Sequence, residues 1–159
     1  MKKVYDTINQ YCVEHELLTN GDGIVIGLSG GMDSVCLLQV LAALRNEWQL
    51  RLVCVHVHHG IRGTAADEDA AFAQRLAAKY NISFRLYEMD IPQLAKEQGL
   101  SEEEAGRNYR YRCFEEVRKE LNFDKIAVAH HRDDQAETVL WQILRGSGLR
   151  GVCGMRAGR

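Results

Sequence analysis

A short segment at residues 29–34, with the sequence SGGMDS, carries the sharpest chemical pattern in the chain. Two adjacent glycines let the backbone turn tightly with its N–H groups exposed, and a helix that begins just after them adds unbonded N–H donors and a partial positive charge. Such a turn binds phosphate, and the hydroxyl groups of Ser29 and Ser34 supply further donors. Because the carboxylate of Asp33 would repel phosphate, its presence indicates a divalent cation between the two.

A simpler interpretation of the same segment is that Asp33 or Ser34 only caps a helix after a glycine turn. The apolar strand predicted before the glycines and the helix predicted after them favour the phosphate loop over the cap. Two other nucleotide-binding loops are excluded here, because no lysine follows the glycines as in a Walker loop and the dinucleotide pattern G-x-G-x-x-G is absent.

Three histidines, His56, His58 and His59, follow the second predicted strand. Side chains alternate along a strand, so His56 and His58 are expected on one face and His59 on the other. This separation favours packed or hydrogen-bonded histidines over a shared metal site. The backbone of residues 55–57 could also offer hydrogen bonds to the edge of a base.

The segment after the fourth predicted strand, AHHRDDQAET, contains several carboxylates. Asp134 and Glu137 are three positions apart and would share one face of a helix. Together they could bind a cationic amine, orient it or remove its proton. Acidic residues in a first helical turn are also favoured by the helix dipole alone, so that explanation stays open.

The helix predicted over residues 101–121 is rich in arginine, and Arg107 and Arg110 share one of its faces. With Tyr109 and Tyr111 between the arginines, this helix could contact a nucleic-acid backbone and stack a base. A solvent-exposed helix with Glu–Arg pairs explains the same residues equally well.

The elements that must position these residues alternate between strands and helices along the chain. In a doubly wound sheet, ligands bind outside the carboxyl ends of the strands where the strand order reverses, so the loops after the first, second and fourth strands are expected to form one site. The alternation predicts an α/β fold, a Rossmann-like doubly wound and mostly parallel sheet of four to five strands with helices on both faces. Apolar patterns predict strands at residues 24–28, 50–57, 82–87 and 125–129, and helices at 3–18, 35–44, 65–80, 91–98, 101–121 with Ser101 as cap, and 133–144.

Composition limits the classes of function. The chain has 159 residues, with 20 Lys and Arg against 22 Asp and Glu, a balance that argues against a dedicated polyanion binder. The five cysteines are odd in number and include no C-x-x-C pair, which favours reduced thiols in the cytoplasm over a disulfide framework or a zinc site. No apolar run approaches the roughly 18 residues that span a membrane, so no membrane partner is expected.

Four motifs together resemble the PP-loop ATP pyrophosphatase superfamily and, within it, the tRNA(Ile)-lysidine synthase family. They are SGGMDS, HVHHGIRG, EEEAGRNYRYR and AHHRDDQAETVLWQILRGSGLRGVCGM, and the resemblance covers about residues 20–155. It implies an ATP-dependent ligase that uses ATP and Mg²⁺ to adenylate C2 of the wobble cytidine in a CAU-anticodon tRNA(Ile), releasing pyrophosphate. The amine of free lysine then attacks C2 and AMP leaves.

The resemblance also implies a role for individual residues and an organisation for the chain. Residues 1–145 would be the ATP-binding catalytic domain, and the glycine-rich residues 146–159 a loop or tail at a truncation point, with the C-terminal tRNA-binding domains absent. A homodimer is compatible with the resemblance. The implied ATP-binding residues are Ser29, Gly30, Gly31, Asp33, Ser34, His56 and His130, with Asp33 also toward the metal, and the implied catalytic residues are Asp33, Arg110, Arg112, Asp134 and Glu137.

Three other functions are compatible with parts of the pattern. A PP-loop tRNA thiolase would transfer sulfur, but the lack of a C-x-x-C pair weighs against it. An amidating ligase would use the same loop to activate a carboxylate for ammonia, and the acidic string and arginine helix fit that chemistry less well. The third alternative is a fragment that binds ATP without catalysis.

Overall fold

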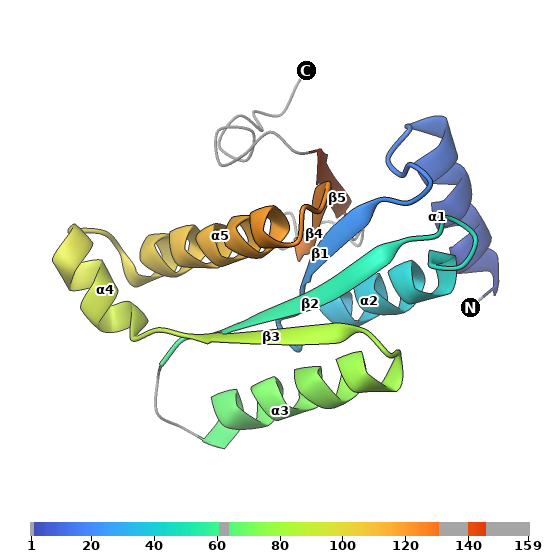
Figure 1. Ribbon diagram of the computed structural model, residues 1–159. Coiled ribbons are helices and arrows are strands. Elements are labelled where there is room, and N and C mark those ends of the chain that lie inside the picture. Colours follow the sequence, from blue (N-terminus) through green and yellow to red (C-terminus); the bar gives the residue numbers. More distant parts are fainter. Residues whose placement is uncertain (1, 61–63, 131–139, 146–159) are drawn as a thin grey trace.

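The computed structural model describes residues 2–60, 64–130 and 140–145 (Figure 1). Its helices and strands alternate along most of the chain, as the apolar pattern predicts. In chain order they are α1 (Lys2–Glu14), β1 (Gly23–Gly27), α2 (Met32–Leu44), β2 (Arg51–His58), α3 (Thr64–Lys79), β3 (Ser83–Glu88), α4 (Ile91–Gln98), α5 (Glu102–Glu120), β4 (Lys125–His130) and β5 (Leu140–Arg145).

The strands of the described residues form one sheet in the order β3–β2–β1–β4–β5. β1 pairs in parallel with both β2 and β4, β3 pairs in parallel with β2, and β5 is antiparallel to β4 at the edge. The chain moves outward from β1 to β3 and then returns to the other side of β1, so the strand order reverses between β1 and β4. This confirms the predicted doubly wound, mostly parallel α/β fold.

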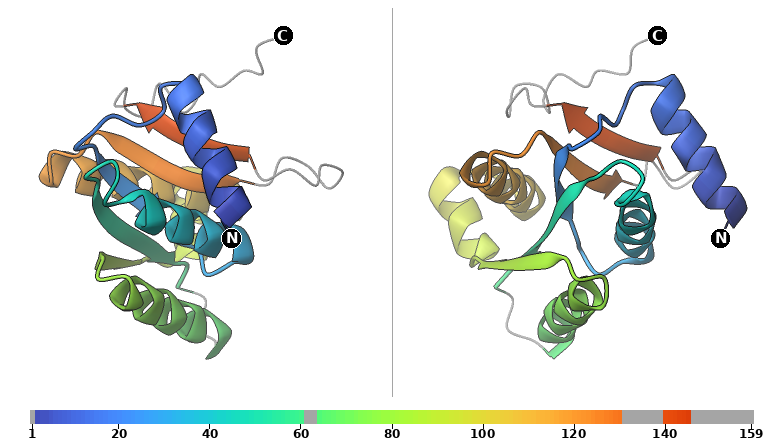
Figure 2. Two further views of the ribbon diagram at one scale, coloured as in Figure 1. Left: turned by 90° about the vertical axis from the view of Figure 1, so that its right-hand side faces the viewer. Right: turned by 45° about the vertical axis from the view of Figure 1, so that its right-hand side comes forward.

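Helices cover both faces of the sheet (Figure 2). Because side chains alternate along a strand, Ile24 and Ile26 of β1 belong to the core beneath α1, α2 and α3. Val25 of the same strand lies in the core on the opposite face, together with Phe114 and Val117 of α5. β1 is therefore buried on both sides, which explains its continuous apolar sequence.

The long helix α5 begins where the sequence predicts. The hydroxyl oxygen of Ser101 accepts a hydrogen bond from the Glu104 N–H at 3.2 Å, which confirms the predicted N-cap. The first turn is acidic and the last turn carries Arg118 and Lys119, so the charges at both ends complement the helix dipole. These local features fix where α5 begins and ends along the chain.

The predicted helix over residues 133–144 is wrong from Leu140 onward. Residues Leu140–Arg145 form β5, which pairs with β4 along its whole length. The sequence LWQILR contains branched and aromatic side chains that suit a strand, and β4 offers it an unpaired edge that the local pattern alone does not reveal. Residues 131–139 lie outside the described residues.

The helix α1 also ends earlier than the prediction, at Glu14 instead of residue 18. Glu16 adopts a left-handed conformation with a φ of 49°, and the Leu17 N–H donates back to the Cys12 carbonyl at 2.9 Å. Leu18 is buried in the core, as its apolar side chain suggests, but it lies after the helix and not within it. The other predicted boundaries lie within one residue of the observed ones, apart from the start of α2, which concerns the site.

A buried ion pair between Asp22 and Lys125 lies at the amino-terminal ends of β1 and β4. The Lys125 ammonium group also donates to the Leu17 carbonyl at 2.9 Å, and Asp22 accepts from the Thr19 N–H at 2.6 Å. All four groups therefore have partners, as buried polar groups require.

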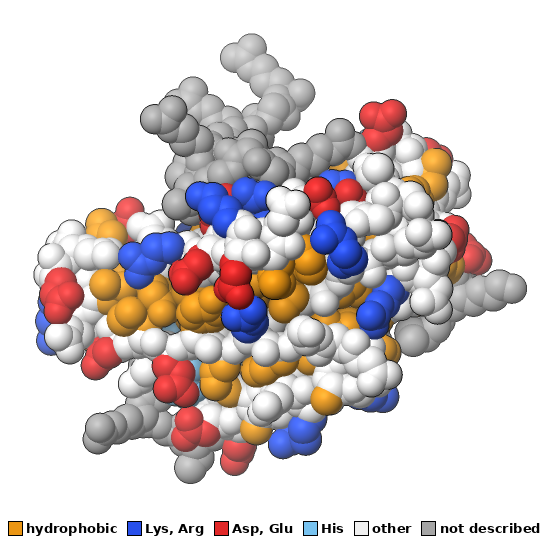
Figure 3. Space-filling view, in the orientation of Figure 1, with side chains coloured by type: hydrophobic (Ala, Val, Ile, Leu, Met, Phe, Trp, Pro, Cys, Tyr) orange, Lys and Arg blue, Asp and Glu red, His pale blue; other side chains and the backbone are white. Residues whose placement is uncertain are grey.

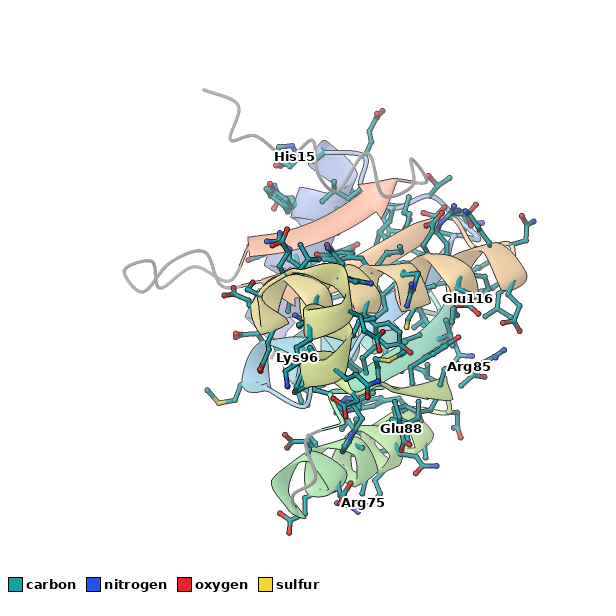
Figure 4. The ribbon with its side chains drawn as sticks, turned by 90° about the vertical axis from the view of Figure 1, so that its left-hand side faces the viewer. His15, Arg75, Arg85, Glu88, Lys96 and Glu116 are labelled. Atoms are coloured by element: carbon teal, nitrogen blue, oxygen red, sulfur yellow. The ribbon has the colours of Figure 1, made fainter. Side chains whose placement is uncertain are left out.

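The outer strand β3 is tied to α5 through Arg85, which donates to Glu120 at 2.8 Å. Figure 4 shows Arg85 on β3 and Glu116 on α5 on the same side of the molecule. None of the described helices is long and apolar enough to cross a membrane.

Candidate functional site

A cavity of ≈ 220 Å³ lies at the carboxyl ends of β1, β2 and β4. The strand order reverses at this place, which is where the topology predicts a ligand site. Figure 3 shows histidine surface only as small areas in the region between α5 and α3, in keeping with recessed side chains. The cavity is lined by residues 27–29, 55–59, Ala66 and Asp69 of α3, Arg110, Tyr111 and Phe114 of α5, and Val128 and Ala129 of β4.

Ser29, the first residue of the SGGMDS loop, lines the cavity, and the loop leads directly into α2. Gly30 has a φ of +93°, a conformation that suits glycine, and Gly31 is the N-cap residue. The Ser29 hydroxyl donates to Ser34 Oγ at 3.1 Å, and the Ser34 hydroxyl donates to the Gly31 carbonyl at 2.8 Å. These two bonds fix the shape of the turn from within.

The helix α2 begins at Met32, three residues earlier than predicted, and no side chain of the described residues caps it. The simpler interpretation, in which Asp33 or Ser34 is the cap, is therefore wrong. Asp33 and Ser34 instead lie in the first turn of the helix, Asp33 partly exposed and Ser34 buried. An uncapped helix start leaves N–H donors available to an external anion.

Asp69 of α3 packs against the loop, and the sequence analysis did not identify it. A Cβ atom added at Gly30 would lie 3.5 Å from Asp69 Cβ and 3.6 Å from its Oδ1. Asp69 also lines the cavity, so a second carboxylate lies beside the phosphate loop besides Asp33. Its sequence, DED near the start of a helix, is typical of ordinary first-turn acids, and only the packing of α3 against Gly30 distinguishes it.

The three histidines all line the cavity, but each has different contacts. His56 is buried, with its Nδ1 atom 2.6 Å from the Leu28 carbonyl oxygen. His58 accepts from the Gly60 N–H at 3.1 Å through Nδ1, and its Nε2 lies 3.1 Å from Asp67 Oδ1.

His59 rests against Gly106 of α5, where an added Cβ would lie 3.3 Å from the ring. Burial, with smaller contributions from Arg110 and the other two histidines, lowers the pKa of His59 below its usual value. Among the described residues no group of three or more His, Cys, Asp or Glu side chains is arranged to hold a metal ion. His56 and His58 have side-chain hydrogen-bond contacts, and His59 packs against Gly106 of α5.

The two arginines implied to be catalytic have different surroundings. Arg110 lines the cavity, and its Nε atom is buried without a hydrogen-bond partner in the described part of the chain. Arg112 is exposed, with its guanidinium carbon 5.0 Å from the ring centre of Tyr109. Tyr109 and Tyr111 are both buried, so neither ring lies free on the surface to stack a base.

The remaining site residues fall at or beyond the end of β4. His130 is the last residue of this strand, and its backbone pairs with Leu140 of β5. Asp134 and Glu137 lie outside the described residues. Of the residues implied by the resemblance, the structure therefore brings together Ser29, His56 and Arg110 around one cavity. Gly30, Gly31, Asp33 and Ser34 follow Ser29 in the loop and the start of α2 but do not line the cavity.

Comparison with known proteins gives one family and several relatives. A family model described as a PP-loop domain matches residues 2–159. The chain is 49% identical over 156 residues to a tRNA(Ile)-lysidine synthase of Caldanaerobacter subterraneus, with 98% of the chain and 32% of that protein covered. It is 41% identical over 154 residues to the protein of the same name from Clostridium tetani, with 97% and 32% covered. The chain thus spans about a third of the length of these curated relatives.

Two solved structures share the fold at lower identity. A tRNA thiolase, NcsA, from Methanococcus maripaludis has a TM-score of 0.62 and 22% identity, with 80% of this chain and 45% of that chain covered. An NH3-dependent NAD synthetase from Campylobacter jejuni has a TM-score of 0.57 and 19% identity, with 79% and 54% covered. At these identities the likeness concerns the fold alone.

Proposed function

Because the chain belongs to the PP-loop domain family, we propose that it is the ATP-binding catalytic part of a tRNA(Ile)-lysidine synthase. The observation that carries the proposal is the uncapped start of α2 beside a cavity at the reversal of strand order. The relatives that match almost the whole chain bear this name, which supports the same reaction.

ATP would bind with its phosphates at residues 29–34 and its base in the cavity. The N–H groups of the glycine turn and of the first turn of α2 suit phosphate oxygens. The cavity walls include apolar side chains such as Val55, Phe114 and Val128, which suit the faces of a purine.

The residues present fit a magnesium ion that is shared with the phosphates. Asp33 and Asp69 offer hard carboxylate oxygens beside the loop, and Mg²⁺ in nucleotide sites is usually held by one or two carboxylates plus phosphate oxygens. Magnesium would neutralise negative charge on the triphosphate. Asp33 would hold it, and we add Asp69 as a second carboxylate within the same region.

The proposed reaction has two steps. The C2 carbonyl oxygen of the wobble cytidine attacks the α-phosphorus of ATP, and the bond between the α- and β-phosphates breaks to release pyrophosphate. The ε-amine of free lysine then attacks C2, loses a proton, and AMP leaves with the former carbonyl oxygen. Donors fixed around the leaving pyrophosphate stabilise the charge that develops on it, which is the work assigned to residues 29–34.

The remaining residues have proposed roles in the same reaction. Arg110 would balance charge on the adenylate, because its guanidinium group lies at the cavity with an unpaired Nε. Arg112, on the exposed side of α5, would contact tRNA phosphates. His56 and His130 would contribute to the nucleotide site, and Asp134 and Glu137 would hold the lysine. A cytoplasmic location and a homodimer belong to the same proposal, and light scattering tests the dimer.

Sulfur transfer is the main competing function. A thiolase would need a cysteine near the reacting nucleotide, and no cysteine of the described residues lines the cavity. Cys153 lies outside the described residues. We therefore favour the ligase over the thiolase.

Pyrophosphate release tests the proposal directly. The chain is mixed with ATP and Mg²⁺, and lysine and CAU-anticodon tRNA(Ile) are then added separately and together. Release that requires both lysine and this tRNA supports the ligase. Release that requires a sulfur donor instead would support the thiolase, and ATP binding without release under any of these conditions would support a binding module.

A further inference from the structure

The pairing between β1 and β2 ends in an unusual way, one residue before the phosphate loop. The Leu28 N–H donates to the Val55 carbonyl at 2.9 Å, as in a regular parallel ladder. The next step of the ladder would give the Leu28 carbonyl a backbone N–H from β2. Instead, within the described residues, this carbonyl is bonded by the side chain of His56, whose Nδ1 lies 2.6 Å away.

The chemistry of this contact fixes the protonation of the imidazole. A carbonyl oxygen can only accept, so Nδ1 of His56 must carry a hydrogen. His56 is only 5% exposed, and a buried carbonyl without a donor would be unfavourable. The contact therefore holds the Leu28 carbonyl in one direction, at the point where the strand gives way to the loop.

The direction of that carbonyl determines the direction of the next N–H. The described chain has no cis peptide bonds, so the Leu28 C=O and the Ser29 N–H of the same planar unit point in opposite directions. The carbonyl points toward His56 on β2, and β1 lies between β2 and β4. The Ser29 N–H consequently points away from the His56 side chain, and it has no acceptor among the described residues.

We propose that His56 is a positioning residue for the phosphate loop, whose Nδ1–H holds the Leu28 carbonyl so that the Ser29 N–H is presented to a phosphate oxygen of the nucleotide. The inference rests on the proposed function and deepens it, because it assigns His56 an action through the backbone in place of a direct contact with the base. It also explains why a histidine, and not an apolar residue, occupies a buried place at the end of β2.

Two substitutions of similar shape separate positioning from packing. His56→Asn keeps an N–H donor near the place of Nδ1, whereas His56→Leu has the same branching and no donor. Affinities for Mg–ATP and for adenosine are measured by calorimetry on the natural chain and on both variants. We expect His56→Leu to weaken ATP binding at least about tenfold, the effect of losing one hydrogen bond to a charged group. Adenosine affinity should fall by a clearly smaller factor than ATP affinity, since His56 also lines the cavity proposed for the base. His56→Asn should bind ATP nearly as the natural chain does.

The outcomes distinguish this inference from the proposed function. If the natural chain binds ATP and His56→Leu binds it equally well, or if ATP and adenosine are weakened by the same factor, the positioning role is wrong. Failure of the natural chain itself to bind ATP would overturn the proposed function and the inference with it. Should His56→Leu not fold, amide NMR of the natural chain decides, since the Ser29 N–H resonance must shift with ATP and stay in place with adenosine.

Discussion

Arg110 and Arg112 are two positions apart on α5, yet their surroundings differ in a way that predicts opposite effects of removing them. Arg110 has a buried Nε without a partner in the described residues, while Arg112 is exposed and its guanidinium group lies over the ring of the buried Tyr109. A buried N–H without a partner destabilises the ligand-free protein by about 1–3 kcal/mol. We therefore expect Arg110 to bind a ligand, and to lower the stability of the protein when that ligand is absent.

We predict that Arg110→Met raises the melting temperature of the ligand-free chain and weakens ATP binding. An increase in the free energy of unfolding of about 1 kcal/mol, near the lower end of that range, raises the melting temperature by roughly 2–4 °C for a chain of this size. The matched variant Arg112→Met loses only the contact with Tyr109, so its melting temperature should fall slightly and its ATP affinity should stay within about twofold. Calorimetry measures both quantities, and equal behaviour of the two variants would contradict the assignment.

The proposed function places the Asp33 carboxylate beside the phosphates of ATP, so its removal should have two separable effects. Asp33→Asn should abolish the increase in ATP affinity and turnover that Mg²⁺ produces, because a hard oxygen ligand is lost. Without Mg²⁺ the same variant should bind ATP as well as the natural chain or better, since a repulsion is removed. ATP titrations with Mg²⁺ and with EDTA measure this difference, and a variant that keeps the full Mg²⁺ response would remove Asp33 from the site.

At the scale of elements, α5 contains a glycine in its interior that local preference disfavours. Gly106 is buried in the second turn of the helix, where alanine would normally be about 1 kcal/mol more stable. An added Cβ would lie only 3.3 Å from the His59 ring. The glycine therefore lets the loop after β2 pack closely against α5 and form one wall of the cavity.

This packing predicts that the effect of Gly106→Ala depends on His59. In the natural chain the substitution should give no gain in the free energy of unfolding, or a loss, because the histidine must shift. In a His59→Ala background the same substitution should stabilise by about 1 kcal/mol. Urea unfolding of the four proteins measures the coupling between the two sites. Equal effects in both backgrounds would show that the two side chains do not compete for space.

At the scale of the whole molecule, the amino-terminal and carboxyl-terminal ends of the strands differ in how their polar groups are paired. At the amino-terminal ends, both charged groups of the buried pair Asp22 and Lys125 have partners. At the carboxyl ends of the strands, the described part of the chain supplies no side-chain cap for α2 and no hydrogen-bond partner for Arg110 Nε. The paired groups at the amino-terminal ends contribute to stability, whereas the unsatisfied groups at the carboxyl ends are available to a ligand.

Because Asp22 and Lys125 are buried and paired, we predict that replacing only one of them lowers the free energy of unfolding strongly. Lys125→Met should destabilise by about 3–5 kcal/mol, because it leaves the Asp22 carboxylate buried without a counter-charge. Adding Asp22→Asn should recover part of that loss, since the double variant buries no charge and an amide oxygen can still accept from Thr19. Urea unfolding compares the three proteins. A double variant less stable than Lys125→Met alone would contradict this explanation.

Much of the fold follows from local sequence, because the signals involved act over a few residues. Alternating apolar runs predict the first four strands and most helices to within one residue, and Ser101 predicts the start of α5. The glycine pair predicts the turn at residues 29–34. The largest error was decided at a distance: residues 140–145 form a strand because β4 had a free edge, which no local periodicity encodes.

The candidate site divides in the same way between local and distant causes. The sequence alone determined the glycine turn at residues 29–34 and the strand-then-helix order that places it at the carboxyl ends of the strands, since these depend on local backbone conformation. Only the tertiary structure decided that Asp69 packs on Gly30, that His56 holds Leu28, and that Arg110 reaches the cavity while Arg112 does not. These contacts join separate elements, and their geometry depends on how the sheet and helices pack, which residue spacing along the chain does not specify.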